Sequence, residues 1–372
     1  MRQTIEREII VIGGGPAGST AAALMASAGC DVLLLERDAE PRHKVCGEFI
    51  SWDASQYLEK LGLDLPGLGA QTIRNYRIYL HGRCIEGALP SAAHSLSRRR
   101  LDDALLNLAS HRGAEIRRGR NVTSLTAQDK SWMVEAGDEL FSGTAVFLAT
   151  GKHDLRGWLR PKGKKEYIGF KMHIRLDDRQ WQALGDSVEL YFYDGGYVGI
   201  EPVEDGITNI CLIVERSCFE SHGRNWKNLL SSLCYKNSAL KERLYNCKFE
   251  WPQPLAIASI PYGYIGRAPD TASLYRLGDQ MAVIPSFAGD GIAIALHTAF
   301  MAANTYLEGD TPASYLHAAR SSLFCPVTTA VFVDSIIHST FGAALAPILK
   351  QMPQLISLIV RLTRIPTSAK PY

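Results

Sequence analysis

The hydrophobic and polar positions along the chain follow two different patterns. Four short runs are almost entirely apolar, as in the strands of a parallel sheet that is covered on both faces; they are residues 8–13, 31–37, 144–151 and 274–279. Residues 168–176 and 188–214 instead alternate between apolar and polar side chains, with Asp-Gly-Gly and Glu-Asp-Gly turns between them. This alternation predicts an antiparallel sheet with one covered face.

The order of these patterns predicts one domain inserted into another. An Ala-rich helix at about residues 16–28 joins the first two apolar runs into a βαβ unit, and a long helix is expected at residues 291–307. We therefore predict an α/β fold with a Rossmann-like nucleotide-binding domain, an inserted mixed or antiparallel β-sheet domain for the substrate, and a C-terminal helical tail. The predicted bounds are residues 1–70, 95–160 and 270–310 for the discontinuous first domain, 71–94 and 161–269 for the inserted domain, and 311–372 for the tail.

The predicted helices of the tail are unusually apolar. Residues 327–365 are rich in Ala, Ile, Leu, Val and Phe, although charged residues such as Asp334 and Arg364 interrupt them. The longest uncharged run, residues 335–349, is too short to span a bilayer. Three alternatives remain: a pair of core helices, a lid over a lipophilic substrate, or a surface that contacts a membrane.

A glycine-rich turn follows the first predicted strand. Gly13, Gly15 and Gly18 form the pattern G-x-G-x-x-G at the start of the Ala-rich helix. In such a turn the first glycine permits the tight bend, the second lets the backbone approach a pyrophosphate, and the third permits close packing of helix on strand. Glu36 ends the second strand, where a carboxylate hydrogen-bonds the ribose hydroxyls and disfavours a 2′-phosphate. The turn therefore predicts bound FAD or NAD, and not NADP.

Features farther along the chain favour FAD over NAD. Arg98 begins the pattern R-x-x-L-x-x-x-L of an amphipathic helix, and Asp279 ends a strand where an acid can bind a ribityl hydroxyl. The segment Gly289-Asp290-Gly291 opens the long helix, whose N-terminus would stabilise negative charge on a reduced flavin. A dehydrogenase that uses only NAD needs none of these features.

Taken in order, these motifs resemble those of the p-hydroxybenzoate hydroxylase and geranylgeranyl reductase superfamily of FAD-dependent oxidoreductases, whose FAD-binding domain is of the GR2 type. The matching segments are G-G-G-P-A-G at 13–18, L-L-E-R at 34–37, Arg98, G-D at 278–279 and P-x-x-x-G-x-G at 285–291. The resemblance spans roughly residues 5–310 and implies that the inserted sheet covers a substrate pocket above the flavin. The cofactor-binding residues that it implies are Gly13, Gly15, Pro16, Ala17, Gly18, Glu36, Arg37, Cys46, Arg98, Val122, Gly151, Gly278, Asp279, Gly289, Asp290, Gly291 and Ile292.

One segment resembles the geranylgeranyl reductase branch in particular. The sequence K-V-C-G-E at 44–48 is similar to the K-x-C-G-E segment of those enzymes, which implies that Cys46 lies beside the flavin. A lone cysteine is more often only a small buried residue, and reactivity of its thiol would require a lowered pKa.

A second segment matches that branch only in part. Polyprenyl reductases carry Y-x-W-x-F-P in the sheet above the flavin, whereas residues 197–202 read Y-V-G-I-E-P. Gly199 and Glu201 thus replace two large aromatic residues, which widens the expected pocket and changes its polarity. Tyr197 and Tyr191 are the candidate substrate contacts.

Two reactions of a reduced flavin remain open. With oxygen it hydroxylates an electron-rich ring, and Pro285 lies where such enzymes shape the oxygen side; without oxygen, hydride transfer plus a proton from a donor such as Cys46 saturates a double bond. Because the two aromatic residues of the polyprenyl pocket are missing, we favour a monooxygenase acting on a hydrophobic aromatic or polyketide-like substrate. The alternatives are a flavin-dependent reductase of an isoprenoid lipid and a flavoprotein that modifies or docks onto a partner protein.

Composition and charge narrow the expected partners. The 40 basic and 38 acidic residues leave a net charge of +2, which argues against nucleic-acid binding by bulk charge. The eight cysteines contain no C-x-x-C pair, so a reducing cytoplasm is expected and no metal is implied.

Without a second dinucleotide motif, the electron donor must bind transiently, either as NAD(P)H or as a protein. We expect a hydrophobic small-molecule substrate, free or linked to a carrier or protein, and contact with a membrane surface through the tail as an alternative to a fully cytoplasmic location.

A basic run surrounds the segment W-L-R-P-K-G-K-K. It comprises Arg156, Arg160, Lys162, Lys164 and Lys165. We interpret it as a solvated loop, the more common role of such runs, with a docking patch for an acidic partner as the alternative.

Overall fold

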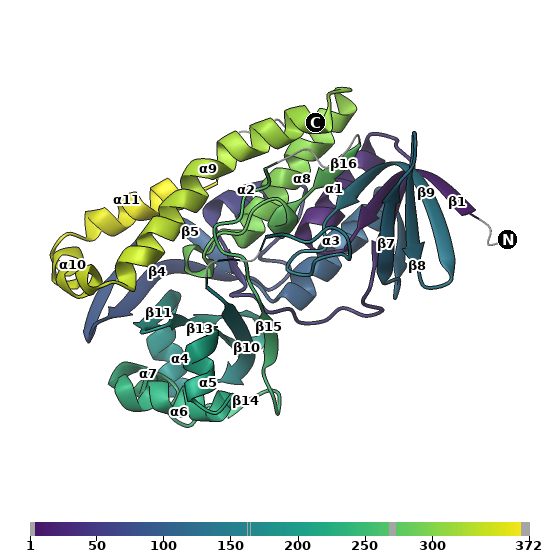
Figure 1. Cartoon of the computed structure of the whole chain (residues 1–372). Helices are drawn as coiled ribbons and strands as arrows, with labels where there is room; N and C mark the ends of the chain where they lie inside the picture. The colour runs from purple at the N-terminus through teal and green to yellow at the C-terminus, as the bar shows by residue number, and fades with distance from the viewer. Residues whose placement is uncertain (1–3, 162, 164, 268–272, 366–372) are drawn as a thin grey trace.

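The computed structural model describes residues 4–161, 163, 165–267 and 273–365 (Figure 1). Within these residues the strands form one seven-stranded and one nine-stranded sheet. The predicted fold class is confirmed: a Rossmann-type α/β domain, a second multi-stranded sheet and a helical C-terminus share one chain.

The seven-stranded sheet builds the FAD-binding domain. Strands β2, β1, β9 and β16 pair in parallel, which explains why these four runs are apolar throughout. Helices α1, α3 and α8 pack against one another beside this sheet, and β7, β8 and β9 form an antiparallel meander at its other edge. The elements of this part are β1 (Thr4–Ile12), α1 (Pro16–Ser27), β2 (Val32–Glu36), α2 (Trp52–Lys60), α3 (Arg98–His111), β6 (Glu115–Arg118), β7 (Val122–Ala127), β8 (Trp132–Ala136), β9 (Glu139–Leu148), β16 (Leu274–Arg276), the 3₁₀ turns η2 (Gly278–Gln280) and η3 (Ser286–Ala288), and α8 (Gly291–Leu307).

The nine-stranded sheet is mixed, because β11 pairs with β4 in parallel while its other pairings are antiparallel. Its order is β14-β10-β13-β12-β11-β4-β5-β3, with β15 also paired to β10. Residues 49–50, which the predicted bounds assign to the first domain, form the edge strand β3 of this sheet. The elements are β3 (Phe49–Ile50), β4 (Gln71–Leu80), β5 (Arg83–Ser95), β10 (Tyr167–Arg175), α4 (Asp178–Leu184), β11 (Ser187–Tyr193), β12 (Gly196–Pro202), η1 (Glu204–Gly206), β13 (Thr208–Glu215), α5 (Arg216–Ser221), α6 (Trp226–Lys236), α7 (Ser238–Arg243), β14 (Lys248–Phe249) and β15 (Leu255–Ala258).

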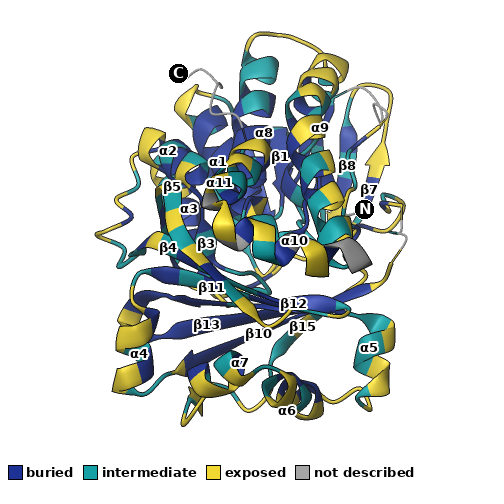
Figure 2. Cartoon of the chain, turned by 90° about the vertical axis from the view of Figure 1, so that its left-hand side faces the viewer, coloured by how far each residue is buried: buried dark blue, intermediate teal, exposed yellow. Residues whose placement is uncertain are grey.

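The prediction that only one face of this sheet is covered is wrong. Phe170, Met172 and Ile174 on β10 do pack against helices α4, α6 and α7, as the alternation predicts. The opposite face is also buried, because it lies against the FAD-binding domain: Lys171 is 0% and His173 is 4% exposed (Figure 2). The polar side chains of the alternating pattern therefore mark an internal polar site and not a solvated face.

Three helices form the C-terminal tail: α9 (Pro312–Ile337), α10 (Thr340–Gln351) and α11 (Pro353–Thr363). Helix α9 packs on α8, and α10 and α11 pack on β5. Among the described helices, α9 alone is long and apolar enough by length and composition to cross a bilayer, and 22% of its most apolar window is buried in the protein. The shorter segments Gly342–Leu349 and Gln354–Thr363 meet that test only as a bent pair.

Candidate functional site

The loop between β1 and α1 has the backbone of a phosphate-binding turn. Gly13 has φ +106°, and a side chain added there would lie 2.5 Å from the carbonyl oxygen of Ala149. A side chain added at Gly18 would lie 1.9 Å from the carbonyl oxygen of Gly13, so only glycine permits α1 to start this close to the strand. Gly15 caps α1 without a side-chain hydrogen bond, which leaves the helix N-terminus available to an anion.

Glu36 shapes the next part of the loop at the end of β2. Its Oε2 accepts a hydrogen bond from the backbone N–H of Gly14 at 2.6 Å, and its Oε1 accepts one from the N–H of Asp38 at 2.9 Å. The carboxylate is buried and lies on the wall of a cavity of about 340 Å³, which we call the dinucleotide cavity.

Most of the predicted cofactor-binding residues line two adjoining cavities. Those on the dinucleotide cavity are Gly13, Gly15, Glu36, Arg37, Arg98, Val122, Gly151 and Asp279. A second space of about 150 Å³, the flavin cavity, is lined by Gly15, Pro16, Ala17, Cys46, Arg98, Gly151, Gly278, Asp279, Gly289, Gly291 and Ile292. The two cavities adjoin each other, because both are lined by Gly15, Arg98, Gly151 and Asp279. Gly18 lines neither cavity but packs against Gly13 in the turn.

Arg98 stands at this junction as the first residue of α3. Its Nε and Nη2 donate to the two carboxylate oxygens of Asp102 at 2.7 and 2.9 Å. Burial opposes the charge of this guanidinium, but the Asp102 carboxylate outweighs it and raises the pKa of Arg98. The result is a fixed cation beside Gly15, where a pyrophosphate would need one.

Three predicted residues point away from the flavin cavity. Asp290 directs its buried carboxylate to Arg364 at the end of α11, whose Nη1 donates at 2.7 Å. Pro285 lines a different cavity, although its neighbours Ile284 and Ser286 line the flavin cavity. Tyr191 lies on the far face of the second sheet and donates to Glu189 Oε2 at 2.6 Å, because the period of a strand turns it opposite to Leu190 and Phe192. These three side chains therefore do not line the flavin cavity.

Cys46 lies on the flavin cavity, as the resemblance implies. Its Sγ accepts a hydrogen bond from the backbone N–H of Glu48 at 3.3 Å. Asn209 on β13 holds this segment from the second sheet, since its Nδ2 donates to the carbonyl oxygens of Gly47 at 2.8 Å and of Cys46 at 3.3 Å.

A buried polar cluster joins the segment after Cys46 to β10. Glu48, 0% exposed, contacts the Lys171 ammonium, and its Oε2 accepts from His173 Nε2 at 2.7 Å. Burial raises the pKa of Glu48, but the charge of Lys171 and the contact with His173 outweigh burial and lower it to about 2. His43 packs against His173 with ring centroids 4.7 Å apart, and burial together with the Lys171 charge lowers the pKa of His43 to about 4.

The ligand atoms of His43, Glu48 and His173 lie within 4.8 Å of one another, close enough to share a cation. The ammonium of Lys171 already supplies a positive charge to Glu48. The ion pair of Glu48 with Lys171 therefore balances the negative charge of this cluster.

A third space, which we call the apolar pocket, adjoins the flavin cavity. It has a volume of about 370 Å³, and Gly47, Phe49, Cys211, Ser286 and Gly289 line both spaces. Its walls come from the second sheet on one side and from the tail helices on the other. The apolar side chains include Ile78, Leu80, Leu190, Phe192 and Tyr197 from the sheet, and Phe332, Ile336, Leu349, Ile356 and Leu362 from the tail. Of the two predicted substrate contacts, only Tyr197 lies here.

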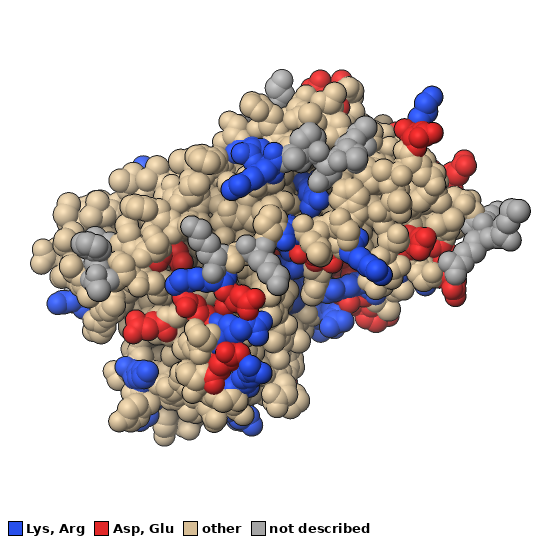
Figure 3. All heavy atoms as spheres, in the orientation of Figure 1, with Lys and Arg blue, Asp and Glu red and all other residues tan. Residues whose placement is uncertain are grey.

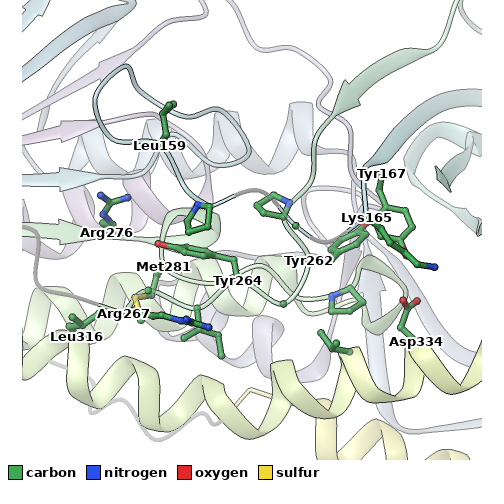
Figure 4. A pocket seen from close by; sticks show the side chains of 18 of the residues that line it. Leu159, Lys165, Tyr167, Tyr262, Tyr264, Arg267, Arg276, Met281, Leu316 and Asp334 are labelled. Carbon is green, nitrogen blue, oxygen red and sulfur yellow. The ribbon is translucent and has the colours of Figure 1, made fainter. Parts of the chain in front are cut away.

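A larger cavity of about 810 Å³ lies on the other side of Tyr262, which lines both it and the flavin cavity. Figure 4 shows Tyr262 and Tyr264 in this space, which we call the tyrosine cavity, with Arg267 and Asp334 on its border. The hydroxyls of Tyr262 and Ser286 lie 2.5 Å apart. Lys165 and Arg276 also line the tyrosine cavity, so its described wall carries three basic side chains.

The basic run is only partly the solvated loop that we expect. Arg156 is exposed, and Lys162 and Lys164 lie outside the described residues. Arg160, in contrast, is 6% exposed and donates to Asp154 Oδ1 at 2.6 Å and to the carbonyl oxygen of Asp279 at 2.7 Å. Its role is therefore structural, since it ties this loop to a segment that lines the flavin cavity.

Comparisons with known proteins agree with this geometry. Residues 6–140 match the family described as FAD binding domain. The chain is 27% identical over 337 residues to digeranylgeranylglycerophospholipid reductase 2 of Methanosphaera stadtmanae, which covers 82% of this chain and 80% of the relative. It is 28% identical over 322 residues to menaquinone reductase of Mycobacterium tuberculosis, which covers 80% and 75%. These matches agree with the resemblance of the chain to the p-hydroxybenzoate hydroxylase and geranylgeranyl reductase superfamily.

Solved structures show the same fold. The flavin-dependent brominase Bmp2 superimposes with a TM-score of 0.78 at 18% identity and covers 96% of this chain and 93% of its own. A geranylgeranyl bacteriochlorophyll reductase-like protein from Thermoplasma acidophilum superimposes with a TM-score of 0.73 at 17% identity, covering 99% and 94%. At these identities the likeness concerns the fold alone.

The residues present fit an FAD molecule. The glycine turn would not accept side chains at Gly13 or Gly18, the N-terminus of α1 carries no side-chain cap, and Arg98 supplies a fixed positive charge. This chain is therefore an FAD-dependent oxidoreductase.

Several residues around the site are not among the predicted site residues. Lys152 and Cys211 line the flavin cavity, Lys171 and His173 build the buried cluster, and Glu201 lies on the apolar pocket. The signal that could have found Lys171 and His173 is their alternation with apolar residues in a strand, read as facing a site and not solvent.

Proposed function

We propose that this flavoprotein reduces carbon–carbon double bonds in the isoprenoid chain of a lipid. The observation that carries the proposal is the apolar pocket, which opens directly onto the flavin cavity. A pocket walled by aliphatic and aromatic side chains binds a hydrocarbon by excluding water, and offers few polar groups to a hydroxylated ring.

The names of the relatives also support the reduction of an isoprenoid lipid. Those that cover four-fifths of this chain are named as reductases of a digeranylgeranyl phospholipid and of menaquinone, both molecules with isoprenoid chains. The tail helices also suit a long, flexible substrate, because Phe332 and Leu362 line the pocket and are at the same time exposed at the surface. A chain longer than the pocket would continue outward along these helices.

Each part of the site has a distinct task in this reaction. When bound and reduced, FAD supplies the hydride. Glu36 and the glycine turn hold the dinucleotide, and Arg98 binds its pyrophosphate charge. The apolar pocket orients the alkene and excludes water, which concentrates reactants and prevents side reactions. Cys46 lines the flavin cavity and Glu201 lines the apolar pocket, and each side chain can carry a proton.

We further propose that the reductant approaches through the tyrosine cavity. That space reaches the flavin cavity at Tyr262, and Lys165, Arg267 and Arg276 give its wall positive charge. These cations suit either the phosphates of NAD(P)H or the acidic surface of an electron-transfer protein.

The test is single-turnover reduction without oxygen. The purified holoenzyme is reduced with dithionite under argon and mixed with a lipid that carries a geranylgeranyl chain, and the product is analysed by mass spectrometry. We expect flavin reoxidation to coincide with a gain of two hydrogen atoms per double bond. Reoxidation only after oxygen is admitted, with an unsaturated lipid recovered, would overturn the proposal.

One observation favours a second candidate, a monooxygenase of a hydrophobic aromatic substrate. Gly199 leaves open a place that is occupied by a large aromatic residue in the polyprenyl reductase segment, so the pocket could hold a ring next to Tyr197. For that reaction, oxygen admitted to the reduced enzyme must give a flavin hydroperoxide absorbance and a hydroxylated product.

A further inference from the structure

Glu201 is a buried acid in an apolar pocket. The residue is 3% exposed and lies on β12, on the wall of the apolar pocket close to the flavin cavity. Within the described residues, neither Oε1 nor Oε2 has a hydrogen-bond partner. Burial without a partner disfavours an ionised carboxylate at such a place, so the neutral acid is the favoured form.

Asn209, the residue opposite Glu201 in the sheet, also favours the protonated form of Glu201. Glu201 pairs directly with Asn209 on β13, and side chains of a directly opposed pair lie on the same face. The amide nitrogen of Asn209 is engaged by Gly47 and Cys46, while its Oδ1 is buried and has no donor within the described structure. The carboxyl group of Glu201 and the unpaired Oδ1 of Asn209 therefore lie on the same face of the sheet. A proton on Glu201 supplies the one hydrogen bond that satisfies both.

The charges around Glu201 also raise its pKa and so favour the protonated form. Burial contributes most and raises the pKa of Glu201 well above its ordinary value, and the negative charge of Glu48 raises it further. Lys171 and Asn209 oppose this, but do not outweigh it. Lys171 is already neutralised by Glu48.

Glu201 belongs to a row of polar side chains on one face of the second sheet. His173, Asn209 and Glu201 are paired in register across β10, β13 and β12. His173 contacts Glu48 on one side and stacks on Trp251 with ring centroids 4.9 Å apart. His43, which is only partly buried, packs against the same tryptophan at 4.9 Å. The row thus connects the pocket wall to titratable groups near the surface.

We propose that Glu201 is the proton donor of the reductase reaction, an assignment that rests on the proposed function. The π bond of the alkene breaks and two C–H bonds form: one carbon takes a hydride from the reduced flavin, and the other takes the proton of the Glu201 carboxyl group. The flavin is left oxidised and Glu201 is left as a carboxylate, which regains a proton from solvent before the next turnover. The acid lies on the wall of the apolar pocket, so it can act on an alkene that is bound there.

The test compares Glu201→Gln with wild type in two independent measurements. The first is infrared difference spectroscopy of the holoenzyme at pH 7, where we expect a carboxylic acid C=O band in wild type that Glu201→Gln lacks. The second is single-turnover saturation of the geranylgeranyl lipid under argon, where we expect a loss of about 10²- to 10⁴-fold. FAD content and lipid binding should stay as in wild type, because glutamine has the same shape. Glu215→Gln, the same change at the end of β13 and away from the pocket, should behave like wild type in both.

Each outcome decides the assignment. A missing acid band, or saturation by Glu201→Gln as fast as by wild type, overturns the proton-donor role while the reductase function stands. Failure of wild type to saturate the lipid overturns the proposed function and, with it, this role. The acid band together with a slow Glu201→Gln and a normal Glu215→Gln supports it.

Discussion

Glu36 uses both of its carboxylate oxygens to fix the backbone that surrounds the dinucleotide cavity. Replacement by alanine removes the hydrogen bonds to the N–H groups of Gly14 and Asp38, together with the group expected to hold the ribose. Hydrogen bonds to a charged group contribute about 1.5–3 kcal/mol each. We therefore predict that Glu36→Ala raises the dissociation constant of FAD about 10- to 100-fold, measured by titration of the deflavinated protein with FAD.

The control for this prediction is Glu40→Ala. Glu40 follows in the same loop but is exposed, so its removal should leave FAD affinity unchanged. Both variants should keep the far-UV circular dichroism of wild type. Full FAD occupancy of Glu36→Ala after gel filtration would contradict the assignment of this residue.

The sequence pattern predicts the glycines that the backbone of the turn requires. It does not predict which charged side chains are buried. Gly13 and Gly18 are required by a turn that the sequence pattern defines completely, and the structure places both in it. The burial of Lys171 and Glu201 depends on which domain covers their sheet, and this follows from the tertiary arrangement and not from the local period. Asp290 shows the same limit, since its partner Arg364 lies in the tail.

At the scale of elements, strand β12 decides how wide the apolar pocket is. A methyl group added at Gly199 would lie 3.6 Å from the Leu190 and Tyr197 side chains, which is ordinary contact. An indole at this position would extend into the apolar pocket of about 370 Å³. We predict that Gly199→Trp lowers the affinity for a geranylgeranyl lipid at least tenfold, measured by calorimetric titration, because the indole takes up space that the hydrocarbon needs.

Gly199→Ala is the matched control and should bind the lipid as wild type does. FAD binding should be normal in both variants, since Gly199 does not line the flavin cavity. Tighter lipid binding by Gly199→Trp would show that the substrate lies elsewhere or that an aromatic wall helps to hold it.

Helices and strands were predicted well where a single hydrophobic period continues through the whole segment. The bounds of α8, Gly291–Leu307, agree with the helix expected at residues 291–307, and β10 covers residues 167–175 of the alternating run. The error lay in assigning faces: alternation shows which residues share a side of β11 but not which side meets the pocket. Tyr191 was therefore placed on the wrong wall.

At the scale of the whole molecule, three parts of the chain meet around one reaction space. The FAD-binding domain lies on one side of this space and the second sheet lies on the other (Figure 2). The tail helices line its outer side. Helix α9 of the tail packs on α8, and the tail helices also line the apolar pocket. Sequence reasoning could not distinguish these roles, since both require apolar helices.

The outer surface of the tail remains apolar, and we predict that it attaches the protein to membranes. In the view of Figure 3, the surface over α10 and α11 carries few charged side chains. Met352 is 49% and Leu358 is 52% exposed, and neither lines the pocket. Inserting such side chains into the acyl region stabilises binding by up to about 1.5–3 kcal/mol each. Wild type should therefore sediment with phosphatidylcholine vesicles, and Met352→Glu/Leu358→Glu should lose about tenfold or more of this partition.

Tyr235→Glu is the control for a general loss of surface hydrophobicity. Tyr235 is 90% exposed on α6, in the layer of helices on the far side of the second sheet, so its replacement should leave vesicle binding intact. The double variant should also keep single-turnover activity with lipid dispersed in detergent, because the pocket wall is unchanged, and should lose activity only with lipid presented in vesicles. Equal vesicle binding by wild type and the double variant would contradict attachment through the tail and leave these helices as a wall of the pocket alone.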